Sequence, residues 1–313
     1  MDDASDEFRF LPEQAADLDV EVIPPVARLT ATLPEGREVS ALRFGEGPPV
    51  AVFLHGGGLN AHTWDTTILA TGLPAIAVDL PGHGDSSWRD DETYSGRTLA
   101  EDIAPAIREW TDAPFVLVGH SLGGLAAAAV AARHPDLARE LIVIDITPGL
   151  DPDGGAAQIR AFFAGPTDWT SREELVERAL AFGLGGSRAA AARGVFLNSR
   201  VRADGRVEWK HHYARIANRL AADSTAADEA EKKQRTLRDA LASSGWKDLA
   251  DVTVPLTLVR GTRGFLTDAD VAEFRRRLPA ATVIELESGH NVHEQMPAAL
   301  ARIVVDAAHP DGE

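Results

Sequence analysis

A serine between glycines is the clearest sign of chemistry in the sequence. Residues Gly119 to Gly123 follow the apolar run Phe115 to Val118 and precede an alanine-rich segment, Leu125 to Ala132. This succession predicts a strand, a sharp turn and a helix, a nucleophile elbow in which small residues let the strand and the helix pass closely. Ser121 would then stand exposed at a helix N-terminus, where a nucleophile is accessible.

A serine hydroxyl is a poor nucleophile at neutral pH, so it needs a base, an acid that orients the base, and donors for the oxyanion. His290 is the predicted base, because it lies just beyond the apolar run Thr282 to Leu286 and late in the chain, as the order nucleophile, acid, histidine requires. His293 is nearby, but it lies three residues into the next element, and we interpret it as a bystander.

The glycine run His55 to Gly58 follows the apolar segment Val50 to Leu54 and predicts the oxyanion site. Backbone N–H groups must point at one spot, and residues without side chains permit that approach. We assign one donor to the Gly57 N–H and the other to the N–H of Leu122, the residue after the nucleophile. Gly58 could replace Gly57, because three glycines do not fix the register. A phosphate-binding loop is disfavoured, since no Gly-Lys-Ser/Thr follows.

Two aspartates compete for the role of the acid. Asp145 directly follows the apolar run Leu141 to Ile144, at the carboxyl end of a predicted strand. Asp268 follows the next strand, but Thr267 and Asp270 resemble the start of a helix with acidic residues in its first turn, which explains these carboxylates structurally. We therefore assign the acid to Asp145, with Asp268 as the alternative.

These residues need a scaffold of buried strands and covering helices. The predicted buried strands are Val50 to Leu54, Ala75 to Val78, Phe115 to Val118, Leu141 to Ile144, Leu256 to Val259 and Thr282 to Leu286, preceded by two short strands around Ala27 to Leu33 and Val39 to Phe44. Helical patterns cover Thr98 to Trp110, Leu122 to Arg133, Ala269 to Arg277 and Pro297 to Ala308. Their alternation predicts an α/β fold with a mostly parallel, doubly wound sheet, whose active residues lie at the carboxyl ends of strands.

Two segments fall outside this alternation. Residues 1–20 are acidic and poorly patterned, and we expect a flexible or loosely docked extension. Residues 148–254 contain no convincing buried strand but show helical patterns at Ala156 to Phe163, Arg172 to Phe182 and Thr225 to Ala242. We interpret residues 148–254 as a helical cap, inserted into a core of residues 21–147 and 255–313.

Composition limits the partners and the compartment. The 313 residues carry a net charge of −17 and no cysteine, which argues against nucleic acid or an anionic membrane and excludes disulfides and thiolate metal sites. The first seven residues lack a basic region, and no apolar stretch approaches the roughly 18 residues of a membrane span. We expect a cytoplasmic protein without a cofactor or a metal site; its oligomeric state is open.

The sequence resembles the α/β-hydrolase superfamily over about residues 40 to 147 and 250 to 308. The matching stretches are His55 to Gly58 with Trp64 downstream, Asp79 to Ser86, the segment around Ser121, and Ser288 to His290. Most members carry the acid after the penultimate strand, where this chain has Gly264 and Phe265. A subset that includes haloalkane dehalogenases and zearalenone-lactonase-like enzymes carries it after the strand before the cap, at the position of Asp145.

The resemblance also bears on the chemistry. Dehalogenases and epoxide hydrolases of this fold have an aspartate at the elbow, so Ser121 indicates an acyl-enzyme route. In the family, the loop with His83 and Asp85 chiefly shapes the core, and we interpret both residues as structural. The cap is expected to select the substrate. Its aromatic and polar residues are Phe162, Phe163, Trp169, Phe182, Phe196, Trp209, His211, His212, Tyr213 and Trp246.

The sequence therefore predicts a serine hydrolase that cleaves a carboxylic ester or lactone of a small apolar molecule. One alternative is hydrolysis of a carbon–carbon bond in a β-diketone or ring-cleavage product, which this fold supports with the same residues. Another is a binding module that keeps the residues without turnover. Fold and triad set the reaction type, whereas the shape of the cap sets specificity, so the substrate itself stays open.

Overall fold

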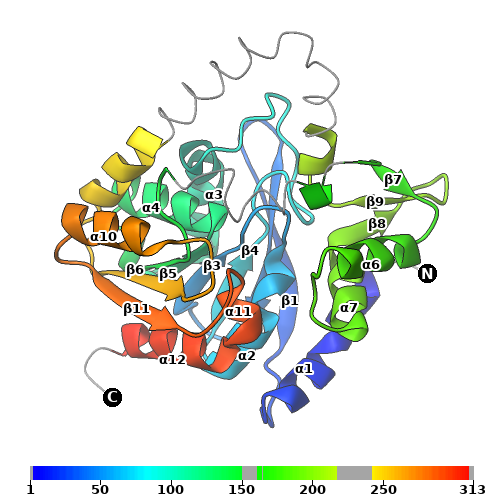
Figure 1. The fold of residues 1–313 in the computed structure, drawn as a ribbon, viewed down its shortest axis with the longest axis horizontal. Coiled ribbons are helices and arrows are strands. Elements are labelled where there is room, and N and C mark those ends of the chain that lie inside the picture. Colours follow the sequence, from blue (N-terminus) through cyan, green and yellow to red (C-terminus); the bar gives the residue numbers. More distant parts are fainter. Residues whose placement is uncertain (1–2, 150–160, 164, 217–241, 310–313) are drawn as a thin grey trace.

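The computed structural model describes residues 3–149, 161–163, 165–216 and 242–309. Its centre is an eight-stranded sheet of order β1-β2-β4-β3-β5-β6-β10-β11 (Figure 1). The strands are β1 (Val26–Thr32), β2 (Glu38–Phe44), β3 (Ala51–Leu54), β4 (Ala75–Val78), β5 (Phe115–His120), β6 (Ala138–Ile144), β10 (Leu256–Gly261) and β11 (Thr282–Leu286). Strand β2 pairs antiparallel with β1 and β4, and the remaining pairs are parallel. The predicted mostly parallel sheet is confirmed.

Helices cover both faces of this sheet, because alternate residues of the buried strands are apolar on both sides. In β3, Val52 and Leu54 pack into one hydrophobic cluster and Phe53 into the other. The first cluster lies under α3 (Gly96–Trp110), α4 (Leu122–Arg133) and α10 (Asp268–Arg277), and the second under α2 (Asp65–Thr71) and α12 (Pro297–Ala308). None of the helices in the described ranges combines the length and the apolar character needed to cross a bilayer.

The parallel register brings the ends of the central strands to one edge. Leu54 of β3 lies opposite Gly119 of β5, and Ile144 of β6 lies opposite both His120 and Val259. The loops that leave β3, β5 and β6 therefore begin side by side at the carboxyl edge of the sheet, and the loop after β11 begins at the same edge on the far side of β10. All residues with a predicted catalytic role belong to these loops or directly follow them.

The N-terminal segment differs from the expected flexible or loosely docked extension. A 3-10 helix (Asp3–Phe10) leads into α1 (Leu11–Asp17), and Leu11 and Ala15 are buried in the same cluster as α2 and α12. The apolar pair at positions i and i+4 forms a stripe that docks the helix. Two apolar residues in a mostly acidic segment were too weak a pattern to predict this helix.

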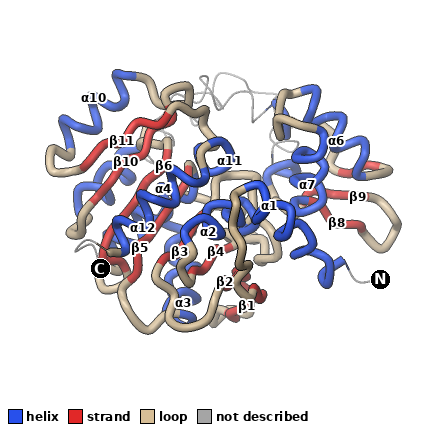
Figure 2. Tube along the Cα trace, turned by 90° about the horizontal axis from the view of Figure 1, so that it is seen from below, coloured by secondary structure: helices blue, strands red, loops and turns tan. Residues whose placement is uncertain are grey.

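The segment between β6 and β10 contains helices and a small sheet (Figure 2). Helix α6 (Arg172–Ala181) matches a predicted helix, whereas α7 (Arg188–Asn198) and the antiparallel sheet β7-β9-β8 were not predicted. Strands β7 (Asp168–Trp169), β8 (Ser199–Val201) and β9 (Val207–Trp209) are two or three residues long, too short for an apolar period, although β9 is buried. Of the other two predicted helices, only residues 161–163 and 242 lie within the described ranges, and both parts are helical. We call residues 148–254 the cap segment.

Candidate active site

The turn between β5 and α4 has the backbone strain of a nucleophile elbow. Ser121 has φ 51° and ψ −120°, a conformation that L-residues rarely adopt. The residues two positions before and after it are glycines for a steric reason: a Cβ on Gly119 would lie 2.7 Å from the carbonyl carbon of Gly123, and one on Gly123 would lie 2.5 Å from the carbonyl oxygen of His55. The strand and the helix therefore pass as closely as the sequence pattern predicted.

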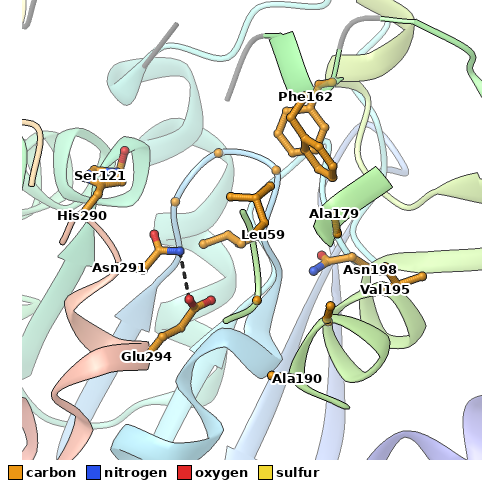
Figure 3. A pocket seen from close by; sticks show the side chains of 18 of the residues that line it. Leu59, Ser121, Phe162, Ala179, Ala190, Val195, Asn198, His290, Asn291 and Glu294 are labelled. Carbon is orange, nitrogen blue, oxygen red and sulfur yellow. Dashed lines mark hydrogen bonds between the residues drawn. The ribbon is translucent and has the colours of Figure 1, made fainter. Parts of the chain in front are cut away.

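His290 follows β11 and is held from three sides. Its Nδ1 lies 2.7 Å from Oδ2 of Asp145, and its ring stacks on Phe265 with centroids 3.6 Å apart and planes 9° apart. The main-chain carbonyl of His290 is 3.0 Å from Nε2 of His120. Ser121 and His290 line the same pocket, at the same end of it (Figure 3). Within the described residues no hydrogen bond joins their side chains; such contacts often tighten only when substrate binds.

Asp145 lies at the carboxyl end of β6 and is fully buried, with φ 48°. Its carboxylate accepts hydrogen bonds from the main-chain N–H groups of Gly261 (3.1 Å) and Phe265 (2.8 Å), besides the contact with His290. A Cβ on Gly264 would overlap this carboxylate, at 2.6 Å from its Cγ. The loop after β10 therefore wraps around Asp145, and the glycine at position 264 makes this possible.

Asp268, the alternative acid, lies elsewhere. It is the first residue of α10, its side chain is 95% exposed, and it forms an ion pair of 2.7 Å with Arg260. Thr267 and Asp270 form the expected capping box at the start of this helix. The structure brings together Ser121, Asp145 and His290, and it leaves Asp268 outside the site.

The glycine loop after β3 packs against the elbow. A Cβ on Gly56 would lie 3.3 Å from Cβ of Ser121, and Gly58 has φ 78°, so the loop needs residues without side chains. His55 anchors the loop: its Nδ1 contacts the Gly56 carbonyl at 2.8 Å and its Nε2 accepts from the Leu80 N–H at 3.0 Å. Burial lowers the pKa of His55 to about 4, so the ring is neutral near pH 7 and can accept.

The two predicted oxyanion donors are available. Leu122 is the first residue of α4, where N–H groups have no partner within the helix. In the part of the chain that the structure describes, no hydrogen bond uses the N–H of Gly57 or of Leu122. Gly57 and Gly58 both line the pocket.

Other histidines surround the site: His120 also lines the pocket beside Ser121, whereas His83 and His293 do not. His120, whose role the sequence did not reveal, is buried behind His290, and burial holds its pKa well below the usual range. His293 is also fully buried, with a pKa that burial lowers to about 3. His83 is buried with Nδ1 3.2 Å from the Pro81 carbonyl, and Asp85 forms a 2.9 Å ion pair with Lys210 of the cap segment. In the described ranges no three His, Asp or Glu side chains are arranged to hold a metal ion.

A cavity of about 170 Å³ opens beside Ser121, between the glycine loop and the cap segment. Of the cap residues expected to face a substrate, Phe162, Phe163 and Trp209 line this catalytic pocket. Trp169 and Phe182 pack within the core of the cap instead, and Trp246 packs against the main core. The four remaining candidates do not line the catalytic pocket. Phe196 contacts Phe10, and His211 lies against Phe163. His212 stacks on Trp88, and Tyr213 packs on Gly57.

The polar lining of the pocket was not predicted. Asn291 and Glu294, which follow His290, line it and share a hydrogen bond of 3.1 Å (Figure 3). Asn198, at the end of α7, lies toward the far end from Ser121. Proximity to His290 in the chain was the only sequence signal for the first two, and Asn198 had none.

Comparisons with known proteins agree with this fold. A model of the "Alpha/beta hydrolase family" matches residues 51–303. "Esterase Rv0045c" from Mycobacterium tuberculosis is 38% identical over 308 residues, covering 96% of this chain and 94% of the relative. A solved structure of that esterase, described in a work on its transition metal inhibition and structural refinement, superposes with a TM-score of 0.78 at 37% identity and covers 96% of this chain and 97% of its own.

A more distant relative has the same extent. "Pimeloyl-[acyl-carrier protein] methyl ester esterase" from Neisseria meningitidis serogroup B is 31% identical over 268 residues, which cover 81% of this chain and 91% of the relative. The family model spans the elbow, the glycine loop and the segment around His290, and both relatives span most of the chain. The chain belongs to the alpha/beta hydrolase family.

Proposed function

We propose that the protein is a carboxylic ester hydrolase that acts through an acyl-enzyme on Ser121. The observation that carries the proposal is the buried chain of contacts from Asp145 to His290, at the end of a pocket that Ser121 also lines. Two relatives that align over most of the chain are named esterases, which supports an ester as the substrate.

Each residue has one task in the first half of the reaction. Ser121 Oγ attacks the ester carbonyl carbon while Nε2 of His290 takes the hydroxyl proton. The negative charge moves to the carbonyl oxygen, which accepts hydrogen bonds from the N–H groups of Gly57 and Leu122; one such donor contributes about 3 kcal/mol to stabilising the transition state. The bond to the alcohol oxygen then breaks, and His290 returns the proton to the departing alcohol.

Water completes the cycle. It attacks the acyl carbon, His290 takes a proton from it, and the acid leaves as Ser121 regains its hydrogen. Asp145 keeps the proton of the imidazole on Nδ1, so that Nε2 remains free to act as the base. The two main-chain donors from Gly261 and Phe265 hold the carboxylate in place for this task.

Covalent labelling and turnover together test the proposal. A fluorophosphonate probe should modify Ser121 in the wild-type protein and not in Ser121→Ala, and the wild type should turn over at least one member of a panel of esters and lactones many times. Turnover of β-diketones with no cleavage of esters would favour carbon–carbon hydrolysis instead. Labelling without any turnover would favour a binding module, and an active Ser121→Ala variant would refute the mechanism.

A further inference from the structure

A second cavity, of about 200 Å³, adjoins the catalytic pocket. We call this second cavity the annex. The two share six lining residues, Leu59, Gly185, Ala190, Gly194, Asn198 and Glu294. They are therefore neighbouring chambers with a common wall, and a substrate that fills the first can extend toward the second.

Helix α7 separates the two chambers by its 3.6-residue period. Ala190, Gly194 and Asn198, spaced four apart, face both cavities. On one side of this row, Ala191 and Val195 line only the catalytic pocket, and on the other side, Arg193 and Leu197 line only the annex. One helix thus presents an apolar flank to the chamber of Ser121 and a cation to the annex.

Gly194, the middle residue of the three on α7 that face both cavities, has no side chain. Gly194 sits inside α7, where glycine destabilises a helix by roughly 1 kcal/mol relative to alanine. A Cβ at this position would have no atom within 4 Å. The absent side chain leaves space at the wall that the two chambers share.

Arg193, which lines the annex, differs from the other arginines of the cap segment in its contacts. The other described arginines of the cap segment each have a hydrogen bond or an ion pair: Arg172, Arg178, Arg188, Arg200, Arg202, Arg206 and Arg215. Within the described residues, the half-buried guanidinium of Arg193 has neither a hydrogen bond nor a carboxylate within 4.0 Å. In a chain of net charge −17, an arginine without such a contact beside a cavity can bind an anion, in competition with the weaker attraction of Glu294 on the shared wall.

A second polar group in the annex also lacks a partner. Gln14 of α1 lines it and is 5% exposed, and its Oε1 has no hydrogen bond to any described residue. A buried amide oxygen without a partner is costly, and it indicates that a ligand or a water donates a hydrogen bond at that place.

The other charged groups of the annex are already engaged. The His62 ring lies 3.0 Å from a carboxylate oxygen of Asp65 and 3.3 Å from one of Glu7. Glu294, on the shared wall, accepts a hydrogen bond from Asn291, and the charge of Arg193 favours its ionised form. Arg193 is thus the cation in the described annex without a carboxylate at contact distance, because Glu294 attracts it only from beyond 4.0 Å.

On this basis, and resting on the proposed ester hydrolysis, we propose that the substrate carries an anionic group, a carboxylate or a phosphate, at the far end of a short apolar chain. The ester carbonyl lies at Ser121, the apolar chain fills the catalytic pocket past Val195 and Trp209, and the anionic end binds Arg193 in the annex. Residue Arg193 is then a determinant of specificity.

The test measures binding and turnover separately. Methyl ketones that mimic the ester but cannot be hydrolysed are prepared with a terminal carboxylate, phosphonate, carboxamide or ammonium group on chains of four to eight carbons. Their affinities are measured by calorimetry, and the matching methyl esters are assayed for kcat/KM. The ratio of carboxylate or phosphonate to carboxamide is the readout, because a change in the active fraction of the enzyme cancels in a kinetic ratio.

In the wild type we expect an anion-to-carboxamide ratio of roughly 10 to 100 at one chain length, as for a hydrogen bond between charged groups. Arg193→Gln should bring the ratio close to 1, and Arg193→Lys should restore part of it. Arg188→Gln is the matched control: it removes the same charge from the same helix, but Arg188 lies outside both cavities and pairs with Glu173 and Glu177. This control should keep the wild-type ratio.

The annex proposal would be overturned if the wild type bound ligands with all four terminal groups equally well or preferred the ammonium ligand. It would also be overturned if Arg188→Gln lowered the anion-to-carboxamide ratio as much as Arg193→Gln does. Absence of turnover of every ester, with the anion preference in binding intact, would instead refute the proposed hydrolysis and leave the anion site standing. Whether carboxylate or phosphonate gives the higher ratio identifies the natural anion.

Discussion

Replacement of Asp145 by asparagine tests the assignment of the acid most sharply. The carboxylate accepts three hydrogen bonds, with the Gly261 N–H on Oδ1 and the Phe265 N–H and His290 on Oδ2. An asparagine has only one acceptor oxygen, so no orientation of the amide satisfies all three. With the NH₂ group in the place of Oδ2, two donors meet at Phe265, and His290 must carry its proton on Nε2, where it cannot act as the base.

The opposite orientation keeps the proper tautomer but sets the NH₂ group against the Gly261 N–H. A buried donor without an acceptor costs about 1–3 kcal/mol, so Asp145→Asn should lose that much stability in either case. If the first orientation prevails, kcat should fall by about 10⁴, the loss seen when the wrong tautomer is fixed in a serine protease. Steady-state kinetics and urea unfolding measure the two effects.

Asp268→Asn is the control. Its side chain is 95% exposed, and its ion pair with Arg260 is a surface interaction worth less than about 1 kcal/mol. We expect kcat within twofold of the wild type and little change in stability. A large loss of kcat in Asp268→Asn together with near-normal activity of Asp145→Asn would refute the reasoning.

Three further predictions follow from other contacts. Gly264→Ala would push a methyl group into the Asp145 carboxylate, so kcat should fall at least about tenfold with unchanged substrate range, and kinetics equal to wild type would contradict the tight fit. Burial depresses the pKa of His293 to about 3, below the value of about 6.5 in the unfolded chain, so the free energy of unfolding falls as pH falls from 6.5 toward 3, by up to about 1.4 kcal/mol per pH unit. The variant His293→Phe should reduce the pH slope of the unfolding free energy by about one proton. An unaltered slope would exclude this role. The catalytic pocket has a volume of about 170 Å³, close to the roughly 150 Å³ of a cavity that holds benzene. The kcat/KM for 4-nitrophenyl esters should therefore peak at acyl chains of about four to six carbons. A kcat/KM that rises up to the dodecanoate ester would show that the site is larger.

The parts of the site that depend on local sequence could be predicted. Ser121 and its glycines form a turn that few other residues can adopt, so the motif carries its own geometry. His290 and Asp145 could be placed because parallel strands bring their carboxyl ends to one edge, and a residue after each strand then lies near the others. The fold followed from the same apolar runs.

The parts that depend on tertiary contacts could not be predicted. Helix α7 is rich in alanine and has no apolar stripe, so nothing in its pattern showed which face it turns to the site. The three-residue strand β9 holds Glu208 at its centre, which interrupts any apolar run. The role of Gly264 depends on the way its loop wraps around the Asp145 carboxylate, since a single glycine between Arg263 and Phe265 otherwise indicates only an ordinary turn.

The most direct test of the account is the capture of its covalent intermediate. The protein is mixed with an excess of 4-nitrophenyl butyrate, quenched in acid within the first turnovers, digested, and analysed by mass spectrometry. We expect a butyryl group on the peptide that contains Ser121, at an amount that matches the burst of nitrophenol, and none in Ser121→Ala. A protein that hydrolyses the ester at its full rate without any acylated Ser121 peptide, or with the acyl group on another residue, would contradict the account.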